Sequence, residues 1–181
     1  MRKLIKLSSL VILLLAASLA VGGCRRQERA RLEVTTEEEP AALASVVHVA
    51  DPATAAQLLK GFHGLEQGSW RWTATRFAVA LRPPARASER GARLEVKLAI
   101  PEVVLARLKT LTLKTTVDGT ALPPETYSKP GDHTYMREVP ASVFTAKPVV
   151  VDFALDKAFI PGGGDQRELG IIVTTIGLEV K

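Results

Sequence analysis

The chain has 181 residues, a formal net charge of +5 and a hydrophobic content of 46%. Three of its cations lie within the first six residues. The rest of the chain therefore carries +2 and lacks the clustered lysines and arginines of a nucleic-acid-binding face. Because there is one cysteine, no internal disulfide can form, and a folded domain must be held together by its hydrophobic core.

The N-terminal segment has the order of residues found in a secretory leader. Arg2, Lys3 and Lys6 give it a basic start, and residues 10–21 are apolar or small apart from Ser18. This apolar run is about half of the ~20 residues that span a bilayer comfortably. Residues 1–23 are therefore predicted to be a signal peptide.

Cys24 directly follows the segment Leu19-Ala20-Val21-Gly22-Gly23. This arrangement resembles the lipobox of bacterial lipoproteins, in which the cysteine receives a thioether-linked diacylglycerol and becomes the first residue after cleavage. The resemblance implies that Cys24 is lipidated and that membrane lipid is a partner, because two or three acyl chains anchor a protein stably. The alternative is a signal anchor with an unmodified cysteine. Arg25, rather than aspartate, follows Cys24, which by analogy with enteric sorting rules favours the periplasmic side of an outer membrane.

Residues 24–45 are predicted to form a flexible tether, because charged residues there give way to small ones without any apolar period. A short helix over residues 25–33 is the alternative. One folded domain, residues 46–181, is expected to follow.

From residue 46 onward, apolar residues recur mostly at every second position, which is typical of strands with one buried face. One helix is predicted over residues 52–60, with Asp51 as its N-cap, Pro52 in its first turn and Gly61 at its end. The strongest strand patterns lie at residues 46–49, 77–81, 94–100, 111–117, 149–155 and 169–180, and the last is apolar on both faces, as a central strand would be.

Turn residues separate these segments. Asp118-Gly119 is a strong signal for a two-residue hairpin. Short helical turns are expected over residues 101–108 and 140–144. Eight or nine strands without alternating helices predict an all-β fold, a single antiparallel β-sandwich of the jelly-roll type. Interruptions of the chain are predicted at Pro83-Pro84, Pro123-Pro124, Pro130-Gly131 and Pro161-Gly162.

The segment Trp70-Arg71-Trp72-Thr73 carries the candidate ligand-binding residues, Trp70, Arg71 and Trp72. Residues two apart on a strand share a face, so the two tryptophans are expected side by side. Flat indole rings suit the C–H faces of sugar rings, and the indole N–H can donate a hydrogen bond. The alternative is that the pair packs into the core. Of the two, Trp72 is expected to be buried, because Trp70 adjoins the turn at residues 67–69.

A glycine-rich segment, residues 162–164, precedes Asp165 and Arg167. A phosphate-binding loop would need a helix after it, whereas a strand is expected here. We therefore interpret the segment as a tight connection, in which Asp165 and Arg167 are structural turn residues that pin the loop by charge-assisted hydrogen bonds.

Two motifs together resemble a β-sandwich module of bacterial surface-polysaccharide proteins that is often found beside glycosyltransferase domains. The resemblance covers residues 61–180 and implies a carbohydrate-binding-like domain with an envelope glycan as its partner. The matching residues are Trp70, Arg71, Trp72 and Thr73, then Pro161, Asp165, Arg167, Leu169 and Gly170.

The sequence contains no G-x-S-x-G or H-E-x-x-H motif and no cysteine nucleophile. Two arrangements stay open: His63 and His133 with Asp132 or Glu66 as a metal or acid–base site, and Glu66 with Asp165 as a glycosidase carboxylate pair. Neither is favoured, so no enzyme, catalytic residue, metal or cofactor is predicted.

The predicted function is that of a lipid-anchored envelope protein whose β-sandwich binds a glycan or a protein partner, and no nucleic acid. A structural or assembly lipoprotein without a small-molecule ligand is the alternative. An envelope hydrolase is a more remote one.

Overall fold

The computed structural model describes residues 43–181, so the predicted signal peptide, Cys24 and the tether up to residue 42 lie outside the described residues. No helix in the described part is long and apolar enough to cross a membrane. The strands are β1 (Val46–His48), β2 (Leu58–Glu66), β3 (Trp70–Leu81), β4 (Ala92–Ile100), β5 (Leu111–Val117), β6 (Thr120–Tyr127), β7 (Gly131–Val139), β8 (Val149–Leu155) and β9 (Ile172–Val180). The helical elements are the 3-10 helices η1 (Pro52–Gln57) and η2 (Ala141–Val143) and the α-helices α2 (Ala87–Arg90) and α3 (Glu102–Leu108).

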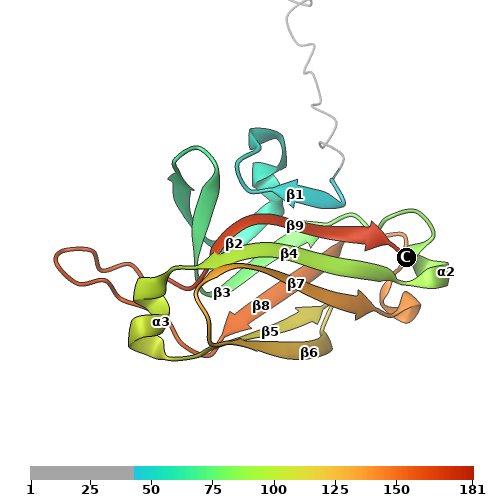
Figure 1. The fold of residues 1–181 in the computed structure, drawn as a ribbon. Coiled ribbons are helices and arrows are strands. Elements are labelled where there is room, and N and C mark those ends of the chain that lie inside the picture. The colour runs from blue at the N-terminus through green and yellow to red at the C-terminus, as the bar shows by residue number, and fades with distance from the viewer. Residues whose placement is uncertain (1–42) are drawn as a thin grey trace, which may run out of the picture. The chain divides into compact units, whose positions relative to one another are not determined.

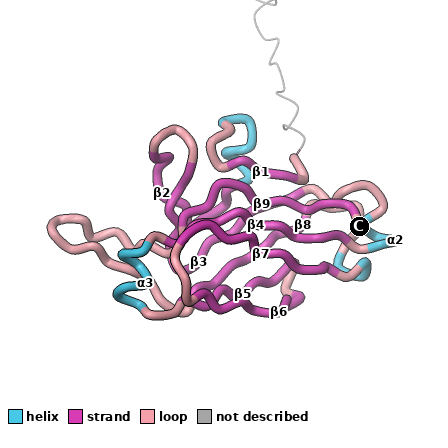
Figure 2. Tube along the Cα trace, in the orientation of Figure 1, coloured by secondary structure: helices cyan, strands magenta, loops and turns pink. Residues whose placement is uncertain are grey.

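These strands form one antiparallel sheet that folds over on itself into two layers (Figure 1). Seven of them follow the order β6-β5-β8-β3-β9-β4-β7, while β1 pairs with β9 and β2 with β3. In Figure 1, β9, β4 and β7 lie nearer to the viewer, and β3, β8 and β5 lie behind them. Figure 2 shows that strands dominate and that the helices are confined to connections. The predicted all-β antiparallel sandwich is confirmed.

Strand β3 joins the two layers because it changes partners along its length. Its first residues pair with β9, where Arg71 lies opposite Val173 and Trp72 opposite Ile172. From Arg76 onward β3 pairs with β8 instead. The segment with both tryptophans therefore belongs to the front layer and lies beside the C-terminal strand.

Alternating apolar residues fill the space between the layers. Every second residue of β4, starting at Ala92, is buried, and β8 has the same pattern from Val149. Phe77 of β3 and Phe153 of β8 are cross-strand partners whose rings stack with centroids 4.6 Å apart. Each fully buried side chain of this size contributes about 1.5–3 kcal/mol, which is how a domain of this size is held without a disulfide.

The hairpin, the short helices and the central strand agree with the sequence pattern. Asp118 and Gly119 join β5 to β6, and both have positive φ values, 45° and 81°, as a two-residue hairpin turn of type I′ requires. Helices α3 and η2 lie at the two predicted helical turns. Strand β9 is central, because β4 flanks one side while β3 and β1 share the other.

The predicted helix over residues 52–60 is confirmed over residues 52–57, as a 3-10 helix, and is wrong over residues 58–60. Asp51 does cap it, since its carboxylate accepts a backbone N–H two residues later at 2.9 Å. The helix ends at Gln57, however, and Leu58 starts β2, which pairs with β3. Gly61 lies inside that strand with φ at 74°, where an added Cβ would collide with the backbone carbonyl of Arg76. Strand pairing, a tertiary effect, overrides the local helix signal.

The predicted interruption at Pro123-Pro124 is also wrong, because both residues lie within β6. Strand β6 is at the edge of the sheet, and its pairing with β5 shifts register at the two prolines, so neither one breaks a regular ladder hydrogen bond. The facing edge strand, β7, has no clear apolar alternation. We call the line along which the edge strands β6 and β7 face each other the seam. Arg137 of β7 bridges it: its Nε donates to the Pro123 carbonyl at 2.8 Å and its Nη2 to the Pro124 carbonyl at 3.1 Å.

Candidate functional site

The two tryptophans lie in contact at the start of β3. Their ring centroids are 6.1 Å apart and the rings are nearly perpendicular, at 80°. Trp72 is buried, with 9% of its surface exposed, whereas Trp70 is half-buried and packs against the core. Trp72 is thus the buried member of the pair, as expected, and Trp70 is the one with ring surface open to solvent.

Arg71 uses its guanidinium to hold two backbone segments. Its Nε donates to the carbonyl of Val49 at 2.9 Å, and its Nη1 donates to the carbonyl of His63 at 3.0 Å. These bonds tie the connection after β1 to strand β2. Arg71 and its neighbours in β3 alternate in direction, so its side chain leaves the opposite face from the two tryptophans. The predicted segment therefore divides into two tryptophans on one face and a positioning arginine on the other.

Trp72 begins a row of side chains that crosses four strands. It is the partner of Ile172 in β9, Ile172 is the partner of Ala99 in β4, and Ala99 is the partner of Asp132 in β7. Direct partners in antiparallel strands project from the same face. Because the chain neighbours of these residues in β4 and β9 are buried, the row lies on the outer face of the front layer.

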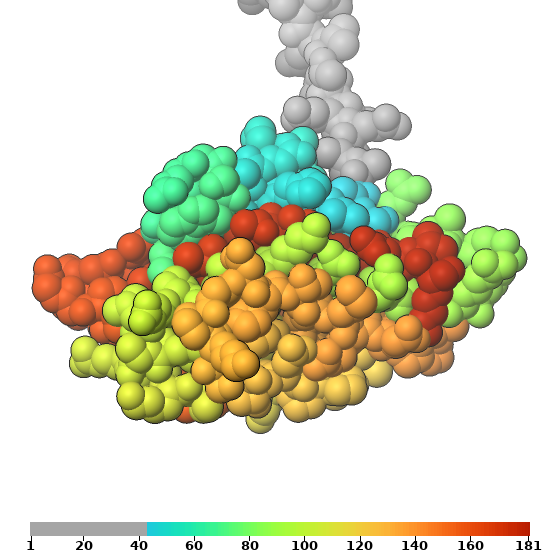
Figure 3. Space-filling view, viewed as in Figure 1, coloured from blue at the N-terminus to red at the C-terminus, as the bar shows by residue number. Residues whose placement is uncertain are grey.

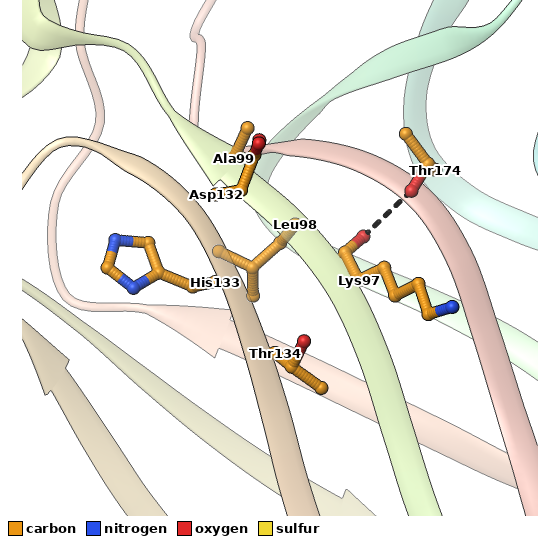
Figure 4. A pocket seen from close by; sticks show the side chains of 7 residues that line it. All are labelled: Lys97, Leu98, Ala99, Asp132, His133, Thr134 and Thr174. Atoms are coloured by element: carbon orange, nitrogen blue, oxygen red, sulfur yellow. Dashed lines mark hydrogen bonds between the residues drawn. The ribbon is translucent and has the colours of Figure 1, made fainter.

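A shallow groove lies at the far end of this row (Figure 4). Its volume is about 370 Å³, which is within the range of small-ligand sites. Figure 3 shows that the side chains of β4, β7 and β9 lie open on this face of the molecule. The groove is lined by Lys97, Leu98 and Ala99 of β4, by Asp132, His133 and Thr134 of β7, and by Thr174 of β9.

The groove offers both donors and acceptors of hydrogen bonds. Asp132 provides a carboxylate, Lys97 an ammonium group and Thr134 a hydroxyl. Thr174 donates to the Lys97 carbonyl at 3.3 Å, where the pairing of β4 with β9 shifts register. The imidazole of His133 points away from Lys97 and Thr174 (Figure 4). A polar groove thus adjoins an apolar strip that leads to the tryptophans.

Asp165 and Arg167 form an ion pair in the loop before β9. The Arg167 guanidinium donates to the Asp165 carboxylate at 2.9–3.1 Å, and its Nη1 donates to Glu66 at 2.8 Å. These bonds hold the pKa of Asp165 below its ordinary value. Glu66 is the cross-strand partner of Trp70, so the loop is tied to the hairpin that carries the tryptophans.

The two enzymatic arrangements left open by the sequence do not match this geometry. Glu66 and Asp165 both bind the same guanidinium, and a lowered pKa at Asp165 is the opposite of what a general acid needs. His63 bonds to the Glu168 carbonyl, whereas His133 bonds to the Lys129 carbonyl near a different turn. Within residues 43–181 no group of three or more histidine, cysteine, aspartate or glutamate side chains is arranged to hold a metal ion.

The sequence did not predict the groove. Asp132 and His133 were considered only as part of a metal or acid–base site with His63. Lys97 and Ala99 belong to a strand that was predicted, but nothing in the sequence distinguishes them from other solvent-facing residues of a strand. Asp132 and Thr134 belong to β7, which has no recognisable strand pattern. Their common position follows from the pairing of β4 with β7 and β9, which joins segments far apart in the chain.

No protein-family model and no curated protein matches this sequence. Among solved structures, the chain is similar to TmCBM27, a carbohydrate-binding module described for its specific recognition of mannan. The identity is 14% and the TM-score 0.44, over 77% of this chain and 97% of that one. It is also similar to the structure of CBM51-2 and INT domains of Clostridium perfringens ZmpB, with CBM51-2 in complex with GlcNAc. Here the identity is 12% and the TM-score 0.35, over 75% of this chain and 28% of that one. Similarities of this size do not assign the chain to a family.

Proposed function

We propose that the domain is a noncatalytic glycan-binding module whose ligand lies along the outer face of the front layer, between Trp70 and the groove at Asp132. The observation that carries this proposal is the row of cross-strand partners Trp72, Ile172, Ala99 and Asp132. Trp70, the half-exposed indole, packs against the buried Trp72 at the start of this row, so an indole, an apolar strip and a polar groove follow one another on one rigid sheet surface.

This combination suits the chemistry of a sugar. A pyranose ring has an apolar C–H face, which packs on an indole or on an apolar strip, and a rim of hydroxyl groups that both donate and accept hydrogen bonds. Asp132, Thr134 and Lys97 supply the complementary groups. Residues on paired strands also hold their positions well, so little ordering is needed on binding.

Lipidation at Cys24 completes the proposal, because it would present the module at a membrane of the cell envelope. The motivation is the leader followed by Gly22-Gly23-Cys24. We place the module on the periplasmic side of an outer membrane, in a cell that has one, since Arg25 follows the cysteine.

A structural or assembly lipoprotein without a small ligand is the second candidate. The observation that favours it is the burial of Trp72, together with the use of Arg71 to hold backbone carbonyls. Both contacts stabilise the domain without any ligand. The two candidates differ in what they predict for Trp70 and for the groove.

The test is glycan-array screening of the full-length, detergent-solubilised protein, followed by calorimetric titration of any glycan that binds. Asp132→Asn and Trp70→Ala are each expected to weaken binding about tenfold, because each removes a contact of about 1.4 kcal/mol. Glu138→Gln is the matched control: it lies on the same strand as Asp132, outside the groove, and is expected to bind as wild type does. If no glycan on the array binds, or if the groove variants bind with unchanged affinity, the glycan proposal is wrong and the structural or assembly lipoprotein is favoured.

A further inference from the structure

The outer face of the back layer carries a second depression, separate from the groove proposed for the glycan. Its volume is about 170 Å³, and strands β2, β3, β5 and β8 contribute to it. Three cations and one carboxylate line it: Lys60, Arg76, Lys114 and Asp152. The lining is therefore net positive.

Strand pairing sets two of these cations on either side of an alanine. Ala154 of β8 is the direct partner of Arg76 in β3 and also of Lys114 in β5. With neighbouring strands about 4.8 Å apart, the Cα atoms of Arg76 and Lys114 are about 10 Å apart. The methyl group between them is short, so it forms a floor over which both long side chains can reach.

The single carboxylate of the depression is already neutralised. Asp152 lies one row along the same face, and its Oδ1 is 3.0 Å from the Nζ of Lys60. Arg76 and Lys114 are both exposed, and neither takes part in any of the ion pairs formed among residues 43–181. Two cations therefore face one small concave site, and their charge is not balanced within it.

We infer that this depression binds one oxyanion group, a phosphate or a carboxylate, held above Ala154 between Arg76 and Lys114. The planar guanidinium of Arg76 can donate two parallel hydrogen bonds to such a group, and the Lys114 ammonium adds a point charge from the other side. A small concave site fits a discrete anionic group on a soluble molecule or a glycan chain. The site is independent of the proposed glycan groove, because the two lie on different layers of the sheet.

The experiment titrates the full-length, detergent-solubilised protein with sodium phosphate and, separately, with sodium glucuronate. Ionic strength is held constant with sodium chloride, so that general screening does not change. Binding is measured by calorimetry and by the rise in Tm that a ligand specific for the folded state produces. A response to phosphate alone indicates a phosphorylated ligand, and a response to glucuronate indicates an acidic sugar. A response to neither overturns the inference.

Three variants test the position of the site. Arg76→Gln combined with Lys114→Gln is expected to weaken binding at least about tenfold, since two charge-assisted contacts are lost. Arg107→Gln combined with Lys129→Gln removes the same charge from exposed positions elsewhere and is expected to bind as wild type does. Ala154→Leu keeps every charge but fills the floor, and it is expected to abolish binding. If the control pair loses as much affinity as the first pair, or if Ala154→Leu still binds, the attraction is only that of net charge and the inference fails.

Discussion

Arg137 offers the sharpest test of how the folded-over sheet is closed. Strands β6 and β7 are the two ends of the strand order and do not pair with each other, and the proline pair in β6 offers no N–H group from which a β6–β7 ladder could be built. The guanidinium bonds to the carbonyls of Pro123 and Pro124 take the place of that ladder, whereas a third bond, to the Met136 carbonyl, lies within β7. We predict that Arg137→Ala weakens the seam more than any single ion-pair loss on the surface would.

The magnitude follows from the contacts that are lost. Hydrogen bonds from a charged group contribute about 1.5–3 kcal/mol each when they are well shielded. Here Arg137 also pairs with Glu125 at 2.9 Å and lies 4.5 Å above the ring of Tyr135. Both partners of the ion pair keep part of their surface in water, 22% and 33%, and the freed carbonyls can be rehydrated. We therefore expect a loss of about 2–4 kcal/mol in the free energy of unfolding, well below the sum of the separate contacts.

The assay is urea unfolding of the full-length protein in detergent, with the free energy taken from the midpoint and the slope. Arg137→Lys keeps a charge near Glu125 but cannot reach both proline carbonyls, so it is expected to lose about 1–2 kcal/mol. Glu125→Gln removes only the partly exposed ion pair and is expected to lose less than about 1 kcal/mol. Hydrogen exchange adds a local measurement: amides of β6 and β7 should exchange faster in Arg137→Ala, while those of β8 should not.

Two results would refute this account of the seam. One is a loss of less than about 0.5 kcal/mol for Arg137→Ala, the size of an ordinary surface substitution. The other is equal behaviour of the alanine and lysine variants, which would show that the fork of hydrogen bonds has no role.

The remaining predictions concern the buried tryptophan, an acid-sensitive loop contact and the anchor. Trp72→Ala should lower the free energy of unfolding by about 3–5 kcal/mol and Trp70→Ala by clearly less, since Trp72 is buried and Trp70 is not; equal losses in denaturant titrations would contradict this. The hydroxyl and the backbone N–H of Thr75 hold the pKa of Glu168 below its ordinary value of 4.5. The contact therefore stabilises the folded state above pH 4.5, and this stabilisation is lost as the pH falls through the lowered pKa. Unfolding measured against pH should therefore be less acid-sensitive in Glu168→Gln, and a profile identical to that of wild type would count against the contact. Cys24→Ser should abolish both acylation and cleavage before residue 24, and a wild-type protein whose mass spectrum shows no acyl chains would overturn the lipoprotein prediction.

The local sequence was sufficient to predict a strand where one face of that strand packs against the apolar core and its residues alternate regularly. Residues 94–100 and 149–155 alternate cleanly, and both are strands with every second residue buried. Asp118-Gly119 predicted its hairpin because the positive φ values of a tight turn restrict which residues can occupy it. In each case the deciding interaction lies within a few residues, so the pattern of residues carries it.

Tertiary structure decided the elements at the edges of the sheet. In β7 the inward positions include His133 and Arg137, which face the seam rather than the apolar core, so no alternation marks the strand. Leu58 begins a strand because β3 lies beside it, although the preceding residues form a 3-10 turn.

The candidate site depended on tertiary structure most of all. The sequence singled out Trp70 and Trp72, because side chains two apart on one strand need only local geometry to meet. Trp72, Ile172, Ala99 and Asp132 form one row only because β3, β9, β4 and β7 pair in that order and in that register. A shift of one residue in any of these pairings would turn the affected strand's side chains to the other face, and no short segment of the chain contains that information.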